Sequence, residues 1–339
     1  MTLEKDRQVG IYKVLGAGRI PGMLGTAPHA GQSTDGRGAG RLPGPLKIGS
    51  SILWMDSTVT RMAQKTLKMP TPLHDRTKHV HVVTWDLGAA SPHTTDVLQG
   101  DLANCPVASI LAAMANTPGG AKRISTAVQE HSANVVTDLS AVMQYLDDDP
   151  DWVDRPNGSL VSNRYFSVDL PDVKQEVSDV FYTDQADKAW DLIYMGVQGI
   201  RRDKGIKPVL WPSVIEKAYA ARLGGYEQLD AVNDPVVAWK ALAGSAPTLV
   251  QVKDLGDSDI TRRAQSATQV PTIATTRDDR RDDTLVETES NGLLEGWHGY
   301  TVTGLAGNQI ALYDPHGKSP KVSLAQFKKF FTTMMYGGL

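Results

Sequence analysis

The sequence predicts an α+β fold with two unlike lobes, the first rich in helices and the second rich in strands. Between about residues 102 and 243, most of the predicted elements are helices with apolar residues at helical spacing. After residue 248, short runs of β-branched and aromatic residues are separated by turn-forming residues. Helices and strands in separate blocks are typical of α+β proteins, whereas regular alternation would predict an α/β fold.

The N-terminal stretch of the sequence would lose much conformational entropy if it became ordered. Residues 1–50 hold 11 of the 31 glycines and little apolar surface, so we expect a mobile or loosely docked arm. Partial order is expected from residues 52–54, with a helical stretch to about residue 67. The strands expected next span residues 79–85, 164–170 and 179–182, and the helices span residues 102–114, 121–146, 186–202 and 212–223.

The last third is predicted to contain one helix and several strands. A helix is expected over residues 234–243 and a strand over 248–252, followed by a polar, charge-alternating region over 254–291 that reads as a solvated loop. Residues 299–305 and 309–313 form a predicted hairpin around a Gly-Asn turn. We therefore divide the chain into an N-terminal extension (1–75, partly disordered), a helical lobe (76–232) and a β-rich lobe (233–339).

Composition excludes several classes of protein. Hydrophobic residues make up 41% and charged residues 22% of the chain, as in globular proteins. A net charge of −3 offers no basic field for a phosphate backbone, so we expect no nucleic-acid partner. No apolar run reaches the roughly 18 residues of a membrane span, and the first residues lack a secretory signal. We expect synthesis into a cytoplasm, with any secretion through a specialised non-Sec system.

The single cysteine, Cys105, lies at the predicted start of the helix over 102–114. Pro106 suits the first turn of a helix, because its missing N–H has no partner there in any case. The unpaired N–H groups and the positive end of the helix dipole favour a thiolate at Cys105. Gln99, with Gly100 as a turn residue, could offer an amide to an oxyanion. A small core residue at the start of a buried helix is the structural alternative.

A histidine and an acidic residue occupy the predicted hairpin. His298 stands at the start of the first strand and Asp314 at the end of the second, so pairing of the strands would bring them together. Asp314 could then orient His298 toward Cys105, as the third group of a nucleophile–base–orienter set. Because 193 residues separate Cys105 from His298, only a cleft between lobes could unite them.

Four blocks of sequence resemble the calpain-like cysteine proteases, which have a papain-type two-lobed fold. The cysteine block has the spacing Gln-Gly-x-Leu-x-x-Cys over residues 99–105. The other three are YFSVDLP (165–171), LWPSVIEKAYAARLGGYEQL (210–229) and NGLLEGWHGYTVTG (291–304). Together they cover roughly residues 80 to 320 in the family's order, which is far more specific than any one block.

The resemblance implies a role for each site residue. Cys105 would be the nucleophile, His298 the general base and acid, Asp314 the orienting group and Gln99 the oxyanion donor. Asp314 stands where the family normally has asparagine, and Trp297 is an insertion. His316 replaces the tryptophan that usually shields the histidine's hydrogen bond, so we expect a wetter and weaker pair.

The function expected from the resemblance is a calpain-type cysteine endopeptidase that acts on a protein or peptide substrate through a thioester. We expect no cofactor and no metal, and we lean against calcium dependence because no EF-hand pattern occurs. A transglutaminase or amidase with the same triad, and a catalytically silent binding module, remain alternatives. The compact build and Gly-rich leader also raise the hypothesis of a secreted effector or toxin, with an inhibitor or immunity protein as partner.

Overall fold

The computed structural model describes eight segments of the chain: residues 64–73, 79–145, 158–183, 192–196, 209–232, 234–277, 286–288 and 292–338. All of them belong to one compact unit, Ser57–Leu339. Helices and separate β-sheets are both present, so the predicted α+β class is confirmed. Within the described segments, every helix is too short or too polar to cross a lipid bilayer.

The first sheet has the strand order β1-β3-β4-β5. Strand β1 pairs in parallel with β3, and the other pairs are antiparallel. A separate two-stranded sheet pairs β2 with β6. The bounds are β1 Lys65–Lys68, β2 His79–Val82, β3 Val128–Asp138, β4 Ser159–Leu170, β5 Val173–Ser178 and β6 Val180–Thr183.

Five helices and two short 3-10 turns accompany these strands. They are η2 Thr94–Asp96, α2 Cys105–Ala115, α3 Pro118–Ala127, η3 Met143–Tyr145, α4 Trp211–Leu223, α5 Tyr226–Asp230 and α6 Pro235–Ala243. Helix α2 is buried from its second residue to its tenth, since most of its residues are small or apolar and fit against neighbours on several sides. Helix α6 packs into the same apolar core through Trp239 and Leu242.

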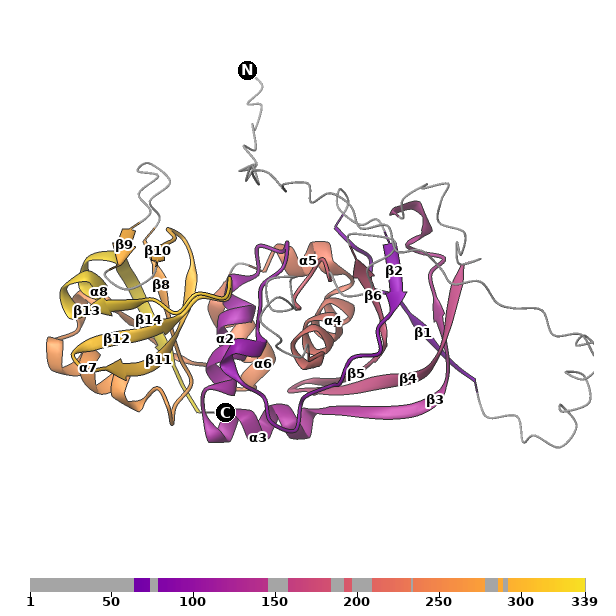
Figure 1. The fold of residues 1–339 in the computed structure, drawn as a ribbon, viewed down its shortest axis with the longest axis horizontal. Helices are drawn as coiled ribbons and strands as arrows, with labels where there is room; N and C mark the ends of the chain where they lie inside the picture. The colour runs from indigo at the N-terminus through magenta and orange to yellow at the C-terminus, as the bar shows by residue number, and fades with distance from the viewer. Residues whose placement is uncertain are drawn as a thin grey trace, which may run out of the picture. The chain divides into compact units, whose positions relative to one another are not determined.

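The second sheet contains six antiparallel strands in the order β13-β12-β11-β8-β14-β7 (Figure 1). Its buried residues form a second apolar core with helices α7 and α8. The bounds are β7 Thr248–Gln251, η5 Val252–Asp254, α7 Asp257–Ser266, β8 Thr272–Thr276, β11 Gly299–Ala306, β12 Gln309–Tyr313, β13 Lys321–Ser323, α8 Leu324–Phe330 and β14 Phe331–Tyr336; β9 Val286–Thr288 pairs with β10 Gly292–Leu294.

Helix α2 packs directly on strand β11 and so joins the two parts of this unit (Figure 1). Ser109 Oγ donates to the carbonyl of Gly299 at 2.7 Å, and Thr301 Oγ1 donates to the carbonyl of Ser109 at 2.7 Å. A Cβ at Gly299 would lie 3.0 Å from Ser109 Oγ, so the absence of a side chain permits this close approach. The contact matters because α2 begins at Cys105 and β11 follows His298.

Several predicted elements differ from those observed. The helix expected over 121–146 ends at Ala127, and residues 128–138 form β3 because this β-branched stretch pairs with β4. The region taken as a loop contains α7 and β8, since Ile260 and Ala264 give α7 a buried face. Residues 65–67, expected to be helical, form β1, and residues 192–196 form a bridge and bends instead of helix.

Other predicted elements are confirmed: the helices near 102–114, 212–223 and 234–243, the strands near 79–85, 164–170, 179–182 and 248–252, and the hairpin of β11 and β12. The predicted arm over residues 1–50, residues 52–54 and most of the helix expected over 186–202 lie outside the described residues.

Candidate active site

Cys105 is the first residue of helix α2, and Pro106 follows it in the first turn, as the sequence predicts. Its side chain is half-buried, so the sulfur lies at the positive end of the helix dipole without being sealed from solvent. Asn104, the residue before the helix, makes no capping hydrogen bond to it. Its side chain instead donates to Glu216 Oε1 at 2.7 Å, which ties the start of α2 to helix α4.

His298 and Asp314 meet at the base of the β11–β12 hairpin. His298 Nε2 lies 3.0 Å from Asp314 Oδ1, and the two side chains are 6% and 0% exposed. The backbone N–H of His298 donates to Thr276 Oγ1 at 2.9 Å, and the N–H of His316 donates to Asp314 Oδ1 at 2.9 Å. Strand pairing therefore brings together two residues that sequence reasoning placed on adjacent strands, and backbone contacts fix both.

The side chain of Cys105 also interacts with the imidazole of His298. Burial by itself would lower the pKa of His298, but the interactions with Asp314 and Cys105 outweigh burial and raise that pKa. Burial likewise favours a neutral Asp314, yet the hydrogen bond and charge of His298 hold the pKa of this carboxyl below its usual value. The pair thus favours a charged imidazolium at His298 beside a charged carboxylate at Asp314.

His298 and Asp314 are both buried although His316 replaces the tryptophan, and a weaker pair stays a prediction. The ring of His316 stacks on the ring of His298, with centroids 4.9 Å apart and planes 14° from parallel. An imidazole therefore covers the side of His298 that a tryptophan was expected to cover. Because Asp314 is fully buried, its hydrogen bond is protected from competing water.

Gln99 lies in the loop between η2 and α2 and is buried. Its side-chain amide donates to the carbonyl of Leu102 at 2.6 Å, and its backbone N–H donates to the carbonyl of Pro315 at 2.9 Å. The loop thereby contacts both the start of α2 and the turn that follows Asp314. Gly100 is required here, because a Cβ would lie 2.3 Å from the carbonyl oxygens of Ile193 and Tyr194.

Glu216 is a residue of this region that sequence reasoning missed. It is buried in α4, where it accepts hydrogen bonds from the side chain of Asn104 and, at 2.8 Å, from the N–H of Met195. Next to it, the buried Lys217 donates to the carbonyls of Ser178 and Val180. The sequence offered one signal for these residues, which is a pair of charged side chains within the small and apolar residues of α4. The pattern does not reveal their hydrogen-bond partners.

Glu216→Gln is expected to remove a loss of unfolding free energy that the wild type has at neutral and alkaline pH. Burial raises the pKa of Glu216 from 4.5 to about 7, although hydrogen bonds from Asn104 and Met195 oppose the shift. This shift lowers the unfolding free energy of the wild type. The loss is absent below the pKa of Glu216 in the unfolded chain and complete above its pKa in the folded chain, where it reaches about 3 kcal/mol. The difference in unfolding free energy between variant and wild type should therefore move in the variant's favour from pH 4.5 to pH 8.

Urea unfolding of both proteins across this range measures that difference. Burial lowers the pKa of Lys217 to about 7. Because Lys217 is present in both proteins, its contribution to the pH dependence cancels in the difference between them. Two parallel pH profiles would show that Glu216 is not the titrating group.

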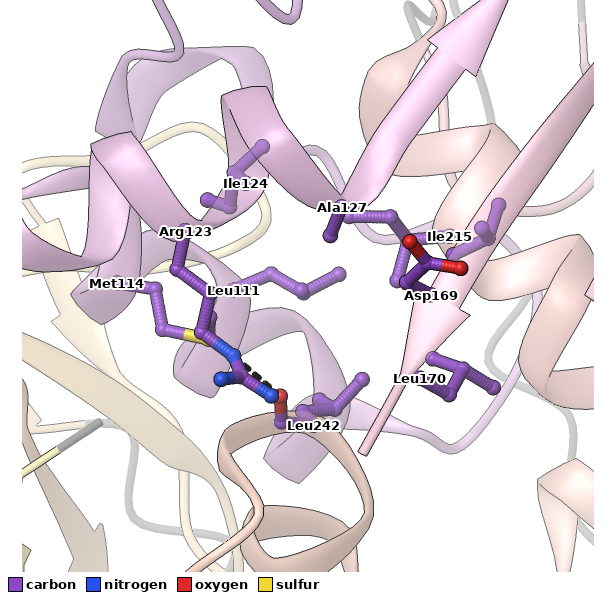
Figure 2. A pocket seen from close by; sticks show the side chains of 10 residues that line it. Leu111, Met114, Arg123, Ile124, Ala127, Asp169, Leu170, Ile215 and Leu242 are labelled. Atoms are coloured by element: carbon purple, nitrogen blue, oxygen red, sulfur yellow. Dashed lines mark hydrogen bonds between the residues drawn. The ribbon is translucent and has the colours of Figure 1, made fainter. Parts of the chain in front are cut away.

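An apolar pocket elsewhere in the molecule is not part of this site. It lies among α2, α3, α4, α6 and β4, and Figure 2 shows Arg123 donating to the carbonyl of Leu242 at its edge. Its α2 residues are Leu111 and Met114, from the later turns of the helix that begins at Cys105. The pocket contains none of the residues that the sequence singled out for chemistry.

Part of the chain matches the model of a known protein family. Residues 185–333 match the calpain family cysteine protease model. This match confirms the resemblance to calpain-like cysteine proteases that the sequence shows. The matched range includes His298 and Asp314. It begins after Gln99 and Cys105, so it does not contain them. A search of curated proteins gave no match.

Proposed function

We propose that the protein is an endopeptidase with a Cys105–His298–Asp314 triad on a two-lobed, papain-like core. The observation that carries this proposal is the buried His298, which hydrogen bonds with Asp314 and interacts with Cys105. A thiol at a helix N-terminus beside a buried and oriented imidazole is suited to nucleophilic catalysis. The two apolar cores support the assignment of two lobes, although helix α6 follows the predicted division at residue 232 and packs into the first core.

The proposed reaction is acyl transfer through a thioester. The Cys105 thiolate attacks a peptide carbonyl, and the backbone N–H of Cys105 and the amide of Gln99 stabilise the resulting oxyanion. His298 then gives its proton to the leaving amine as the thioester forms. In the second half, His298 takes a proton from water, which attacks the thioester and releases the acid and the free thiol. Asp314 keeps the ring oriented through both proton transfers.

The proposed substrate is an exposed, extended segment of another protein. Trp297, immediately before His298, leaves 55% of its surface exposed, and its backbone adopts a left-handed conformation with φ of 53°. An exposed indole held in a strained conformation next to the base offers apolar surface to a substrate side chain.

Alkylation of the single cysteine tests this function directly. The full chain is treated with limiting iodoacetamide, the modified fraction is read by intact mass, and casein digestion is measured on the same samples. Because Cys105 is the only thiol, we expect digestion to fall in proportion to the modified fraction. Cys105→Ala serves as the fully inactive reference.

Each alternative function predicts a different outcome of that experiment. Amide exchange without new peptide termini would favour a transglutaminase or amidase. Digestion that persists in fully alkylated protein would exclude Cys105 as the nucleophile. A thiol that alkylates no faster than glutathione, with no digestion, would favour a silent binding module.

We further propose turnover without calcium or another cofactor, which digestion in the presence of a calcium chelator tests. The effector or toxin role, secretion by a specialised system and an immunity partner are also proposals, motivated by the Gly-rich residues 16–49. Expression of wild type and Cys105→Ala in a foreign cell tests them, and equal harmlessness of the two proteins would contradict a toxic role.

A further inference from the structure

Three metal-binding side chains meet beside the His298–Asp314 pair. Glu295, His298 and His316 each offer a ligand atom, and these atoms lie within 4.8 Å of one another. Glu295 Oε2 is 3.4 Å from His316 Nδ1. Two ligands that bind tetrahedral zinc at about 2.1 Å are themselves about 3.4 Å apart, so this pair already has the required separation. The third ligand, His298, lies within 4.8 Å of the other two and needs an approach of at most about 1.4 Å.

The ligand types favour zinc over calcium or magnesium. Two imidazoles and one carboxylate are a common protein ligand set for Zn²⁺, whereas calcium and magnesium prefer oxygen ligands throughout. The set also leaves a fourth tetrahedral position for water. These three residues therefore fit Zn²⁺ better than Ca²⁺.

Exposure of Glu295 and His316 allows an ion to enter from solvent. Glu295 and His316 are 33% and 37% exposed, whereas His298 is nearly buried and fixed by Asp314. The two histidine rings are nearly parallel, so His316, the more exposed ring, must turn to aim its nitrogen at a shared ion. Lys318 Nζ lies 3.7 Å from Glu295 Oε1, but its side chain is 43% exposed and free to swing into solvent.

We propose that Glu295, His298 and His316 bind one Zn²⁺ ion that blocks the peptidase by holding His298. A ring nitrogen bound to zinc carries no proton, so His298 can no longer serve both Cys105 and a leaving amine. The blocking step rests on the proposed function, whereas binding of the ion does not. Zinc is thus a reversible inhibitor that competes with catalysis for the same imidazole.

The test measures zinc binding and peptide hydrolysis separately on the full chain. Chelator-stripped protein is titrated with Zn²⁺ against a chromophoric chelator, and casein digestion is followed at the same buffered zinc concentrations. The variants His316→Gln and Glu295→Gln each remove one ligand and leave His298 in place. His131→Gln is the matched control, since it removes an imidazole that bonds Ser167 away from the cluster.

We expect wild type and His131→Gln to bind one Zn²⁺ and to lose digestion as the ion binds. Each ligand variant should bind zinc at least about tenfold more weakly, and its inhibition should move to the same higher zinc concentration. Each variant's activity is compared with its own zinc-free value, which separates inhibition from any change in basal rate.

Three results would overturn the proposal: no zinc binding by wild type, equal binding by both ligand variants, or inhibition that persists unchanged when His316 is replaced. The last result would mean that the ion sits on Cys105 and not on the cluster. If no protein digests casein even without zinc, the proposed function fails, and the binding titration alone decides the metal site.

Discussion

His298→Ala is expected to lower kcat for peptide hydrolysis by roughly 10⁴ to 10⁶-fold, with little change in KM. The imidazole interacts with Cys105, and it is the only proposed donor of a proton to the leaving amine. Its loss removes interactions made in the transition state and not in substrate binding. Initial rates on a fluorogenic peptide that the wild type cleaves would measure both constants.

A double variant and a matched control make this result specific. Because nucleophile and base act as one unit, Cys105→Ala with His298→Ala should be no less active than either single variant. His131→Ala, which removes an imidazole from the first sheet, should leave the rate nearly unchanged. Retention of activity within tenfold in His298→Ala would remove His298 from the proposed triad.

Asp314→Ala is expected to lower kcat by roughly 10³ to 10⁴-fold, whereas Asp314→Asn should lose only about 10 to 100-fold. Alanine leaves His298 Nε2 without its acceptor in a buried position, so the ring is no longer oriented. Asparagine keeps an acceptor oxygen for an imidazolium N–H but lacks the charge that stabilises the cation. The difference between these variants separates orientation from electrostatics.

The pH dependence of both Asp314 variants provides an independent readout. Asp314 raises the pKa of His298, and a thiolate–imidazolium pair is lost as pH rises through that pKa. Removing the charge should therefore move the alkaline limb of the kcat/KM profile to lower pH in both variants. An unchanged alkaline limb would contradict the assignment of that limb to His298, even if the rates fall as expected.

Local sequence signals were sufficient for the start of α2 and for the β11–β12 hairpin. Pro106 after Cys105 marks a helix start because its backbone suits the first turn. The Gly-Asn turn and the alternating strands set the pairing that brings His298 to Asp314. Both features depend on residues near one another in the sequence, which is why the pattern predicted them.

Local signals failed where long-range pairing decides the structure. Residues 128–138 were predicted as part of a helix, but they pair with β4, which begins about twenty residues later in the chain. Glu216 was likewise missed as a partner of Asn104, because 112 residues separate the two in the sequence. In each case the partner that stabilises the observed structure lies too far away in the sequence for a local pattern to include it.

The sequence by itself therefore determined the chemical groups: a lone thiol at a helix start, a histidine and a carboxylate on adjacent strands, and the calpain family's sequence blocks. Only the tertiary structure decided that they meet. Packing of α2 on β11 through Ser109 and Gly299 brings His298 to Cys105 across 193 residues. Burial of Asp314 beneath the turn then strengthens its interaction with His298, because a low-dielectric environment with fixed backbone donors exists only in the folded chain.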